Sequence, residues 1–360
     1  MTFKYMEKNM NVKKIIAGAA ILLALTTSLF AKAKKADKNI KIKVVTTIFP
    51  EYDWAREIIG DNAKNVELTL LLGNGVDLHS YQPSIQDIAK ISTADIFIYV
   101  GGESDGWVKD ALKNAKNKNM KIINLLETLG DKVKAEEVKE GMQAEEEDEH
   151  EHHHDDEDED DDDHDHEAEE HHHHHHDDED EVEYDEHVWL SLRNAKILSA
   201  EIAAALCEKD AANAAAYKAN LAAYTARLDA LDAKYTAAVK AGSKKTILFG
   251  DRFPFRYLVD DYGLDYFAAF VGCSAETEAS FETVIFLAKK VDELGLNTVL
   301  KIESGDGKIA RTIVQNTKKK NARVLTMDSI QSTTAKQAAA GTTYLKIMED
   351  NLAVLAEALK

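Results

Sequence analysis

The sequence lacks the motifs by which most enzymes are found. It has no Gly–Lys–Ser/Thr phosphate loop, no HExxH motif, no GxSxG motif and no catalytic Cys–His spacing. The glycines of VGGESDGW (100–107) do not have the spacing of a dinucleotide-binding fingerprint and indicate a strand–helix turn. We therefore expect a binding protein that is not an enzyme.

Cysteine is also scarce, because only Cys207 and Cys273 occur in 360 residues. Two thiols can pair in an oxidising compartment. However, Cys207 lies in the apolar pattern of a helix, AEIAAALCEK, and Cys273 lies in a loop beyond a predicted strand. We predict two separate, unpaired cysteines.

The N-terminus has the pattern of an export signal. Lys13 and Lys14 precede an apolar run at 15–30, and AKA (31–33) offers a small-x-small cleavage site. The run is shorter than the roughly 20 residues of a membrane span, although a membrane anchor is the alternative. No cysteine lies near the cleavage point, so nothing here indicates lipid modification. We expect a signal peptide at 1–33, starting at Met1 or Met10, and a soluble periplasmic or otherwise extracytoplasmic protein.

Basic residues are outnumbered across the chain, with a net charge of −21, but one tract causes this. Residues 145–181 contain 24 carboxylates and 12 histidines, and their only apolar side chain is Ala168. Taking these 24 acids from the chain's 65 leaves 41 against 44 Lys and Arg, a formal charge of +3. The tract is too charged to collapse, so we expect it to be disordered. A nucleic-acid partner is not expected, because it requires a clustered basic surface.

Short runs of β-branched and bulky apolar residues alternate with helical stretches along the chain. The helix PEYDWAREIIG (50–60), for example, starts with a proline and stops at a glycine. This pattern predicts an α/β fold with two lobes, each a mainly parallel sheet flanked by helices. The predicted strands are 42–48, 66–72, 95–101 and 121–126 in the first lobe, and 245–251, 265–271, 297–303 and 322–328 in the second.

A long helix is predicted between the two sets of strands, at 210–241, with Asp210 capping its start and Gly242 ending it. We expect it to be a rigid connection between an N-terminal lobe (38–209) and a C-terminal lobe (245–360), although a packing helix within one domain fits the same pattern. Its apolar stripe has spacings of three and four: Tyr217, Leu221, Tyr224, Leu228, Leu231, Tyr235 and Val239.

Histidine outside the tract occurs only twice, at His79 and His187. Ligands of open α/β sheets bind beyond the carboxyl ends of the strands. His79 follows the second strand, His187 precedes a helix, and Asp251 and Asp328 end strands of the second lobe. Such nitrogen and oxygen donors suit Zn²⁺ and also Mn²⁺. The alternatives are that the histidines have no ligand and that the carboxylates only cap helices.

Five sequence blocks occur in order along the chain: VVTTIFPEYDWAREIIGD, GVDLHSYQPSIQDIAKISTADIFIYVGG, DEHVWLSLRNA, YLVDDYGLDY and LTMDS. These blocks resemble the metal-binding solute-binding proteins of zinc and manganese ABC transporters, most closely the ZnuA-type zinc proteins. The resemblance implies a C-clamp of two lobes with a metal between them and an ABC permease as partner. It implies Zn²⁺ before Mn²⁺ as the metal, with His79, His187 and Asp328 as ligands. We also expect a monomer.

The third ligand of that family is replaced here. The position where the family has a His or Glu holds Arg252, and a guanidinium that stays charged cannot bind a cation. We expect Asp251 or water to complete the metal's ligands. We also expect a carboxylate to hold Arg252; the nearest acids in sequence are Asp251, Asp260 and Asp261.

Zinc-type members of the family often carry a loop rich in histidine and acids between the first two ligands, where 145–181 lies. We expect this tract to collect zinc with low affinity or to sense its abundance; a solvated tract without a role is the alternative. Two alternatives to a zinc receptor stay open. They are a manganese-specific receptor and an extracellular adhesin or metal-buffering protein on the same fold.

Overall fold

The computed structural model describes residues 41–143, 183–274 and 278–360. The predicted signal peptide and the acidic tract lie outside these ranges. Among the described residues, no helix is long and apolar enough to cross a membrane.

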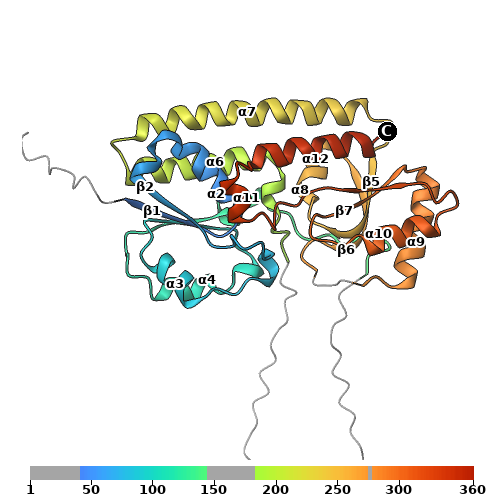
Figure 1. The fold of residues 1–360 in the computed structure, drawn as a ribbon, viewed down its shortest axis with the longest axis horizontal. Coiled ribbons are helices and arrows are strands. Elements are labelled where there is room, and N and C mark those ends of the chain that lie inside the picture. Colours follow the sequence, from blue (N-terminus) through green and yellow to red (C-terminus); the bar gives the residue numbers. More distant parts are fainter. Residues whose placement is uncertain (1–40, 144–182, 275–277) are drawn as a thin grey trace, which may run out of the picture. The chain divides into compact units, whose positions relative to one another are not determined.

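Two parallel four-stranded sheets organise the described chain (Figure 1). Their strand orders are β2-β1-β3-β4 and β6-β5-β7-β8, so the first strand of each set is central. The predicted α/β class with two parallel sheets is confirmed, and each observed strand overlaps a predicted one. The strands are β1 (Ile42–Thr46), β2 (Val66–Leu70), β3 (Ile96–Tyr99), β4 (Lys121–Asn124), β5 (Thr246–Phe253), β6 (Asp265–Val271), β7 (Thr298–Lys301) and β8 (Arg323–Thr326).

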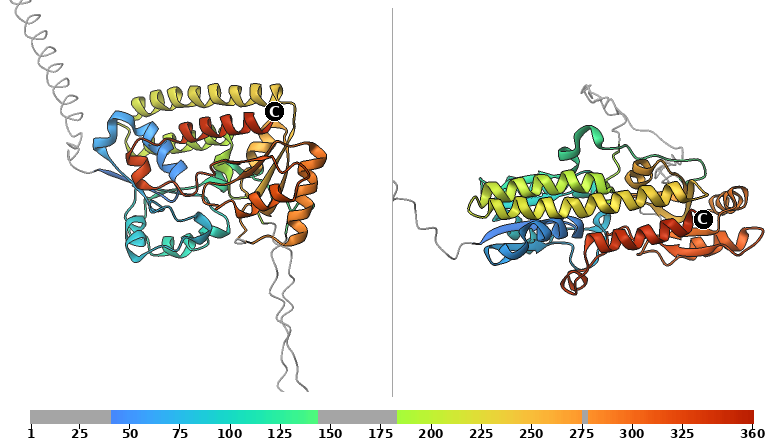
Figure 2. Two further views of the ribbon diagram at one scale, coloured as in Figure 1. Left: turned by 45° about the vertical axis from the view of Figure 1, so that its right-hand side comes forward. Right: turned by 90° about the horizontal axis from the view of Figure 1, so that it is seen from above.

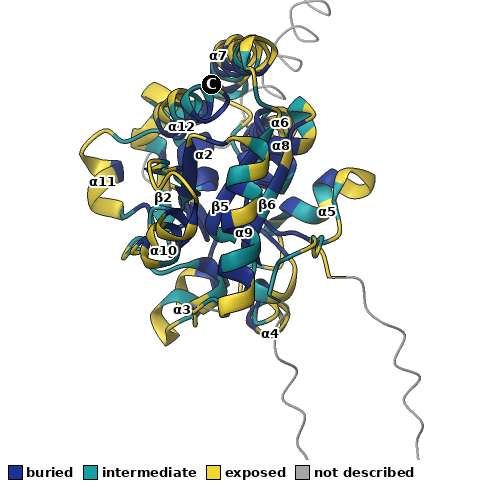
Figure 3. Cartoon of the chain, turned by 90° about the vertical axis from the view of Figure 1, so that its right-hand side faces the viewer, coloured by how far each residue is buried: buried dark blue, intermediate teal, exposed yellow. Residues whose placement is uncertain are grey.

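Helices cover both sheets, and the strands between them are largely buried (Figure 3). In Figure 1, α2 and α6 lie above the first sheet and α3 and α4 below it. Helices α9 and α10 pack on the second sheet. The helices are α2 (Phe49–Ile59), α3 (Ile85–Ser92), α4 (Val108–Lys113), α5 (Leu125–Leu129), α6 (Leu192–Lys209), α7 (Ala214–Ala241), α8 (Arg256–Tyr262), α9 (Phe281–Leu294), α10 (Lys308–Asn316), α11 (Ala335–Ala339) and α12 (Tyr344–Ala358).

The long helix α7 has 28 residues, which makes it about 42 Å long at 1.5 Å per residue. It packs on α2 and α6 beside the first sheet and on α8 and α12 beside the second (Figure 2). Six of the seven stripe residues are buried and Leu221 is half-buried. Gly242 ends the helix as predicted, but the predicted cap was wrong. Asp210 follows the end of α6, and its carboxylate accepts hydrogen bonds from Asn213 and Tyr217.

The C-terminal helix returns to the residues that precede α7, called the first half below, while the residues after α7 form the second half. The Tyr344 ring lies edge-on against Trp54 at 5.4 Å, and the Tyr344 amide donates to the buried Asp53 carboxylate. The Tyr344 hydroxyl donates to the Trp189 carbonyl at 2.6 Å. These contacts tie both halves together, and Ile42–Lys360 forms one compact unit. The boundaries at 209, 241 and 245 therefore stay a prediction.

Strand β5 contains an irregularity beside the region where ligands are expected. Phe249 pairs with Ala268 and Arg252 pairs with Phe270, so two residues of β5 stand opposite one residue of β6. Such a bulge redirects the following side chains. The prediction that the strand ends at Asp251 was wrong, because β5 continues through Arg252 to Phe253.

Candidate metal centre

His79 lies in a short 3₁₀ turn, Leu78–Ser80, that follows β2. The Asp77 carboxylate caps this turn by accepting the His79 amide at 3.1 Å. The Nδ1 atom of His79 is 2.8 Å from Ser104 Oγ and 3.6 Å from Glu186 Oε2. These contacts occupy Nδ1, so Nε2 is left to face the rest of the site.

His187 is completely buried and comes just before the turn that leads into α6. One oxygen of Asp185 accepts the His187 amide at 2.8 Å and lies 3.0 Å from its Nδ1. A carboxylate on Nδ1 fixes the ring and makes the other nitrogen a better metal ligand. The free donor of His187 is therefore also Nε2.

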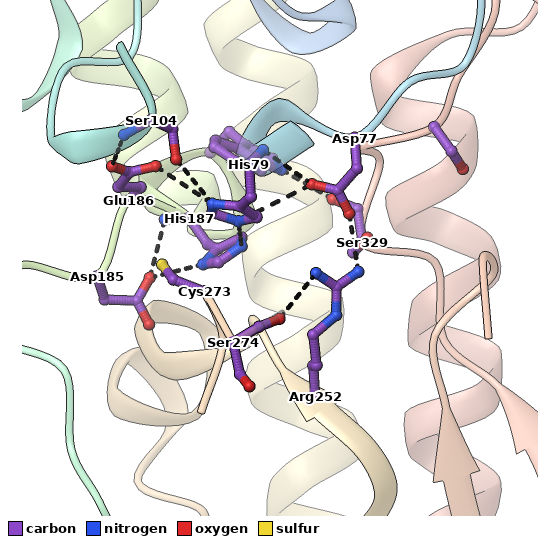
Figure 4. Close-up of polar contacts among 12 residues, drawn as sticks. Asp77, His79, Ser104, Asp185, Glu186, His187, Arg252, Cys273, Ser274 and Ser329 are labelled. Carbon is purple, nitrogen blue, oxygen red and sulfur yellow. Dashed lines mark hydrogen bonds and ion pairs between the residues drawn. The ribbon is translucent and has the colours of Figure 1, made fainter. Parts of the chain in front are cut away.

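The two Nε2 atoms lie 3.1 Å apart, and the rings are tilted at 55° with centroids 5.1 Å apart (Figure 4). The Cys273 thiol lies beside them. One nitrogen of each ring and the Cys273 sulfur are all within 4.8 Å of one another, the one group of His, Cys, Asp or Glu donors with that spacing among the described residues.

Cys273 is the residue that sequence reasoning missed. Both cysteines are free, as predicted, but Cys273 lies in the site. It follows β6, the neighbour of β5, so the parallel sheet brings it to the same edge as Arg252. The signal that could have shown this was its place just beyond a strand's carboxyl end, together with an arginine at the position where the resemblance predicts a ligand.

Arg252 is held by a carboxylate, as predicted, but the partner is Asp77. The Arg252 guanidinium donates to Asp77 at 2.8 Å and to the Ser274 carbonyl at 3.3 Å. The expected acids have other partners. Asp251 accepts the backbone amides of Arg252 and Ile302, Asp260 pairs with Lys134, and Asp261 accepts the Ser191 hydroxyl.

Asp328 lies after β8 and outside the group formed by His79, His187 and Cys273. Its carboxylate accepts the amide of Ile330 at 2.7 Å. Ile330 has a φ of 64°, which is strained for a β-branched residue. This loop places Gln331 in the site. With its nitrogen toward Asp77 at 2.6 Å, the Gln331 amide oxygen accepts from His187 Nε2 at 2.8 Å.

The electrostatic environment separates the two imidazoles. Burial and the nearby charges of His187 and Arg252 lower the pKa of His79 to about 3. Burial also acts to lower the pKa of His187, but Asp185, Glu186 and Asp77 outweigh it and raise that pKa above its ordinary value. His79 is therefore a neutral donor, and a proton competes with metal at His187.

His79 and Cys273 line two cavities, of about 250 and 660 Å³. The smaller is lined by the carboxylates Glu103, Glu136, Glu183 and Glu186. The Glu186 Oε2 atom is buried and has no hydrogen-bond partner among the described residues. The larger also exposes Asp251, Arg252 and the loop before α10. The group of His79, His187 and Cys273 thus lies between a cavity lined by carboxylates and a larger cavity lined by both acidic and basic side chains.

Comparison with known proteins gives consistent matches over nearly the whole chain. It is 27% identical over 343 residues to the zinc-binding protein AdcA of Streptococcus pyogenes, covering 95% of this chain and 61% of that protein. The chain thus spans less than two thirds of AdcA. It is 26% identical over 345 residues to the high-affinity zinc uptake system protein ZnuA of Bacillus subtilis, covering 96% of each.

The fold matches solved structures as well. The Zn(II)-bound ZnuA-like domain of Streptococcus pneumoniae AdcA superposes with a TM-score of 0.63 at 25% identity, covering 89% of this chain and 99% of that one. The family model described as "Zinc-uptake complex component A periplasmic" matches residues 44–358. The chain therefore belongs to the ZnuA family.

Proposed function

We propose that this protein captures Zn²⁺ between the loops of its two sheets and delivers it to an ABC permease for zinc uptake. The observation that carries the proposal is the pair of buried imidazoles whose Nε2 atoms lie 3.1 Å apart. Two nitrogens on a tetrahedral zinc with bonds of 2.0–2.1 Å lie about 3.3 Å apart. The family match and the zinc named for the relatives support the same metal.

His79 and His187 are the proposed imidazole ligands, and Asp328 is the proposed carboxylate. Asp328 accepts the Ile330 amide, so binding zinc requires that oxygen to exchange partners or its other oxygen to turn inward. Gln331 must also release His187 Nε2. Metal binding therefore rearranges the loop that carries both Asp328 and Gln331, and this change couples the site to the second sheet.

The acidic, histidine-rich tract is proposed as a low-affinity zinc collector. The smaller cavity supports this role, because Glu183 and Tyr184, just after the tract, line it together with His79. A row of carboxylates attracts a divalent cation and raises its local concentration. Zinc released by the tract can then pass along the carboxylates of this cavity to His79 and His187.

The protein acts outside the cytoplasmic membrane as an exported monomer in this proposal. Its match to a family described as periplasmic supports the location. The partner is the membrane permease, which accepts the ion when the site opens. An enzymatic role is not proposed, because the site's donor set matches metal capture and the named relatives are zinc-binding and zinc-uptake proteins.

Native mass spectrometry of the full chain, purified without nickel resin, tests the metal. We expect bound zinc, and manganese as the retained metal would contradict the proposal. Uptake of radioactive zinc by zinc-starved cells tests delivery. Cells without this protein should take up less zinc, and restored uptake should require His187. Unchanged uptake in the cells without this protein would favour an adhesin or metal buffer.

A further inference from the structure

The position of Arg252 leaves the second sheet without the donor that the family places there. Arg252 reaches across to Asp77 at 2.8 Å, and its other arm donates to the Ser274 carbonyl at 3.3 Å. The second contact fixes the loop just after Cys273. Arg252 therefore holds that loop against the site while its charge is matched by Asp77.

Gly272 lets the same loop come close to His187. A Cβ atom at Gly272 would lie 3.0 Å from Cε1 and 3.1 Å from Nδ1 of His187, which is tighter than most real contacts. The Cys273 amide donates to Glu136 Oε1 at 3.0 Å. The backbone is thus held at the Cys273 amide, and the sulfur lies beside the imidazoles (Figure 4).

The distances fit a metal bound by all three groups. Bonds of 2.3 Å to sulfur and 2.0–2.1 Å to nitrogen on tetrahedral zinc put sulfur about 3.6 Å from each nitrogen. All three donor atoms are within 4.8 Å of one another, so small side-chain movements suffice. The buried, unpartnered Glu186 Oε2 is 3.6 Å from His79 Nδ1. After a small movement it is placed to accept a hydrogen bond from the Nδ1–H of that ring when Nε2 binds a metal.

We propose that the Cys273 thiolate is a direct zinc ligand with His79 and His187, replacing the ligand lost at Arg252. This inference rests on the proposed zinc-binding function and adds a donor to the same site. On binding, the thiol proton leaves to solvent, a Zn–S bond forms, and no electron is transferred. A thiolate favours Zn²⁺ over Mn²⁺, because soft sulfur donors suit zinc while carboxylates and water suit manganese. The sulfur therefore contributes to metal selectivity.

Cobalt substitution tests the inference on the full chain. Co²⁺ bound by a thiolate shows a sulfur-to-cobalt charge-transfer band in the near ultraviolet. The tract contains no cysteine, so cobalt bound to its histidines cannot give this band. We expect the band at the first equivalent of Co²⁺, its loss in Cys273→Ser, and its retention in Cys207→Ser. Cys207 is the matched control, since its thiol donates to Ala214 O between α6 and α7.

A chelator competition with Zn²⁺ complements the spectrum. Cys273→Ser should weaken tight zinc binding at least about tenfold, because even supporting residues of metal sites cost 10–100-fold. Absence of the band in the wild-type protein would overturn the inference, whether or not the variants fold. If tight zinc binding persists and still requires His187, the proposed function stands. If the wild type does not bind zinc tightly, the proposed function fails as well.

Discussion

The loops of the two sheets contribute different chemistry to one site. The first half of the molecule, meaning the residues before α7, supplies both imidazoles, and each Nδ1 is held, by Ser104 for His79 and by Asp185 for His187. The second half supplies a guanidinium at Arg252, a thiol at Cys273 and the Asp328 loop. The first set resembles a preorganised nitrogen site, whereas the second departs from the expected ligands. We infer that the first half sets whether zinc binds and the second sets how long it stays.

Removing an imidazole should have the largest effect. His187→Ala should weaken tight zinc binding by more than about 100-fold, because a buried ligand has no substitute and its loss exceeds the cost of a supporting residue. His154→Ala is the control, since it removes one of twelve tract histidines. A chelator competition measures both. Equal losses in the two variants would contradict a dominant site in the first half.

Removing the carboxylate behind that imidazole should have the next largest effect. Asp185→Asn keeps the shape but weakens the hold on His187 Nδ1, so we expect a 10–100-fold loss of zinc affinity. Asp95→Asn is a comparable change at a carboxylate that accepts the Lys43 amide away from the site. An Asp185→Asn protein with wild-type affinity would show that the ring needs no orienting partner.

On acidification, zinc affinity should begin to fall at a higher pH than it would if the ligand were a histidine with an ordinary pKa. The pKa of His187 is raised because Asp185, Glu186 and Asp77 outweigh its burial, whereas that of His79 is about 3. Protonated His187 cannot bind metal, so affinity drops as pH falls through its raised pKa, above about 6.5.

The raised pKa of His187 has the opposite effect on the stability of the metal-free fold, which is greater at low pH. The raised pKa stabilises the metal-free fold at low pH, and this contribution is lost as pH rises through the folded value. Zinc competitions and thermal melts at several pH values between about 5 and 8 measure both. In Asp185→Asn the fall in affinity should move to lower pH. An unchanged pH midpoint in that variant would contradict the assigned cause.

Changing the guanidinium should give a smaller effect in the other direction. Arg252→His removes a cation beside the site and frees Asp77, so zinc should be lost to a chelator several-fold more slowly by Coulomb's law at an effective dielectric constant near 20. Arg252→Gln removes the same positive charge without adding an imidazole, so it distinguishes the effect of charge from that of a new ligand. Slower loss in both variants indicates charge alone, and slower loss only in the histidine variant indicates a new ligand. Faster loss from Arg252→His would show that Arg252 matters mainly by holding the Ser274 loop.

Much of the fold could be predicted because its signals are local. Runs such as IKVVT in β1 are apolar and β-branched, and the stripe of α7 has helical spacing. His79 and His187 could be singled out because they are the only two histidines outside residues 145–181 of the sequence. The partner of Arg252 could not be predicted in this way. Asp77 is 175 residues away in sequence, so ranking acids by sequence distance selected the wrong carboxylates.

The place of Cys273 depends on tertiary geometry that no short pattern contains. A bulge in β5 redirects Arg252, and Gly272 allows the next strand's loop to approach His187. The Asp328 prediction came from a family pattern and remains a prediction. Its loop conformation is set by a strained Ile330 and by the amide that Asp328 accepts. The surrounding packing maintains such a strained backbone, and a short stretch of sequence does not reveal that packing.

Zinc calorimetry on the protein lacking residues 145–181 tests the central claim most directly. If the loops of the two sheets form the tight site, deletion should leave one tight binding event and remove the weak ones seen with the full chain. His187→Ala in the shortened chain should then abolish the tight event. Loss of the tight event on deletion alone, with the fold intact by circular dichroism, would contradict a site built from His79 and His187.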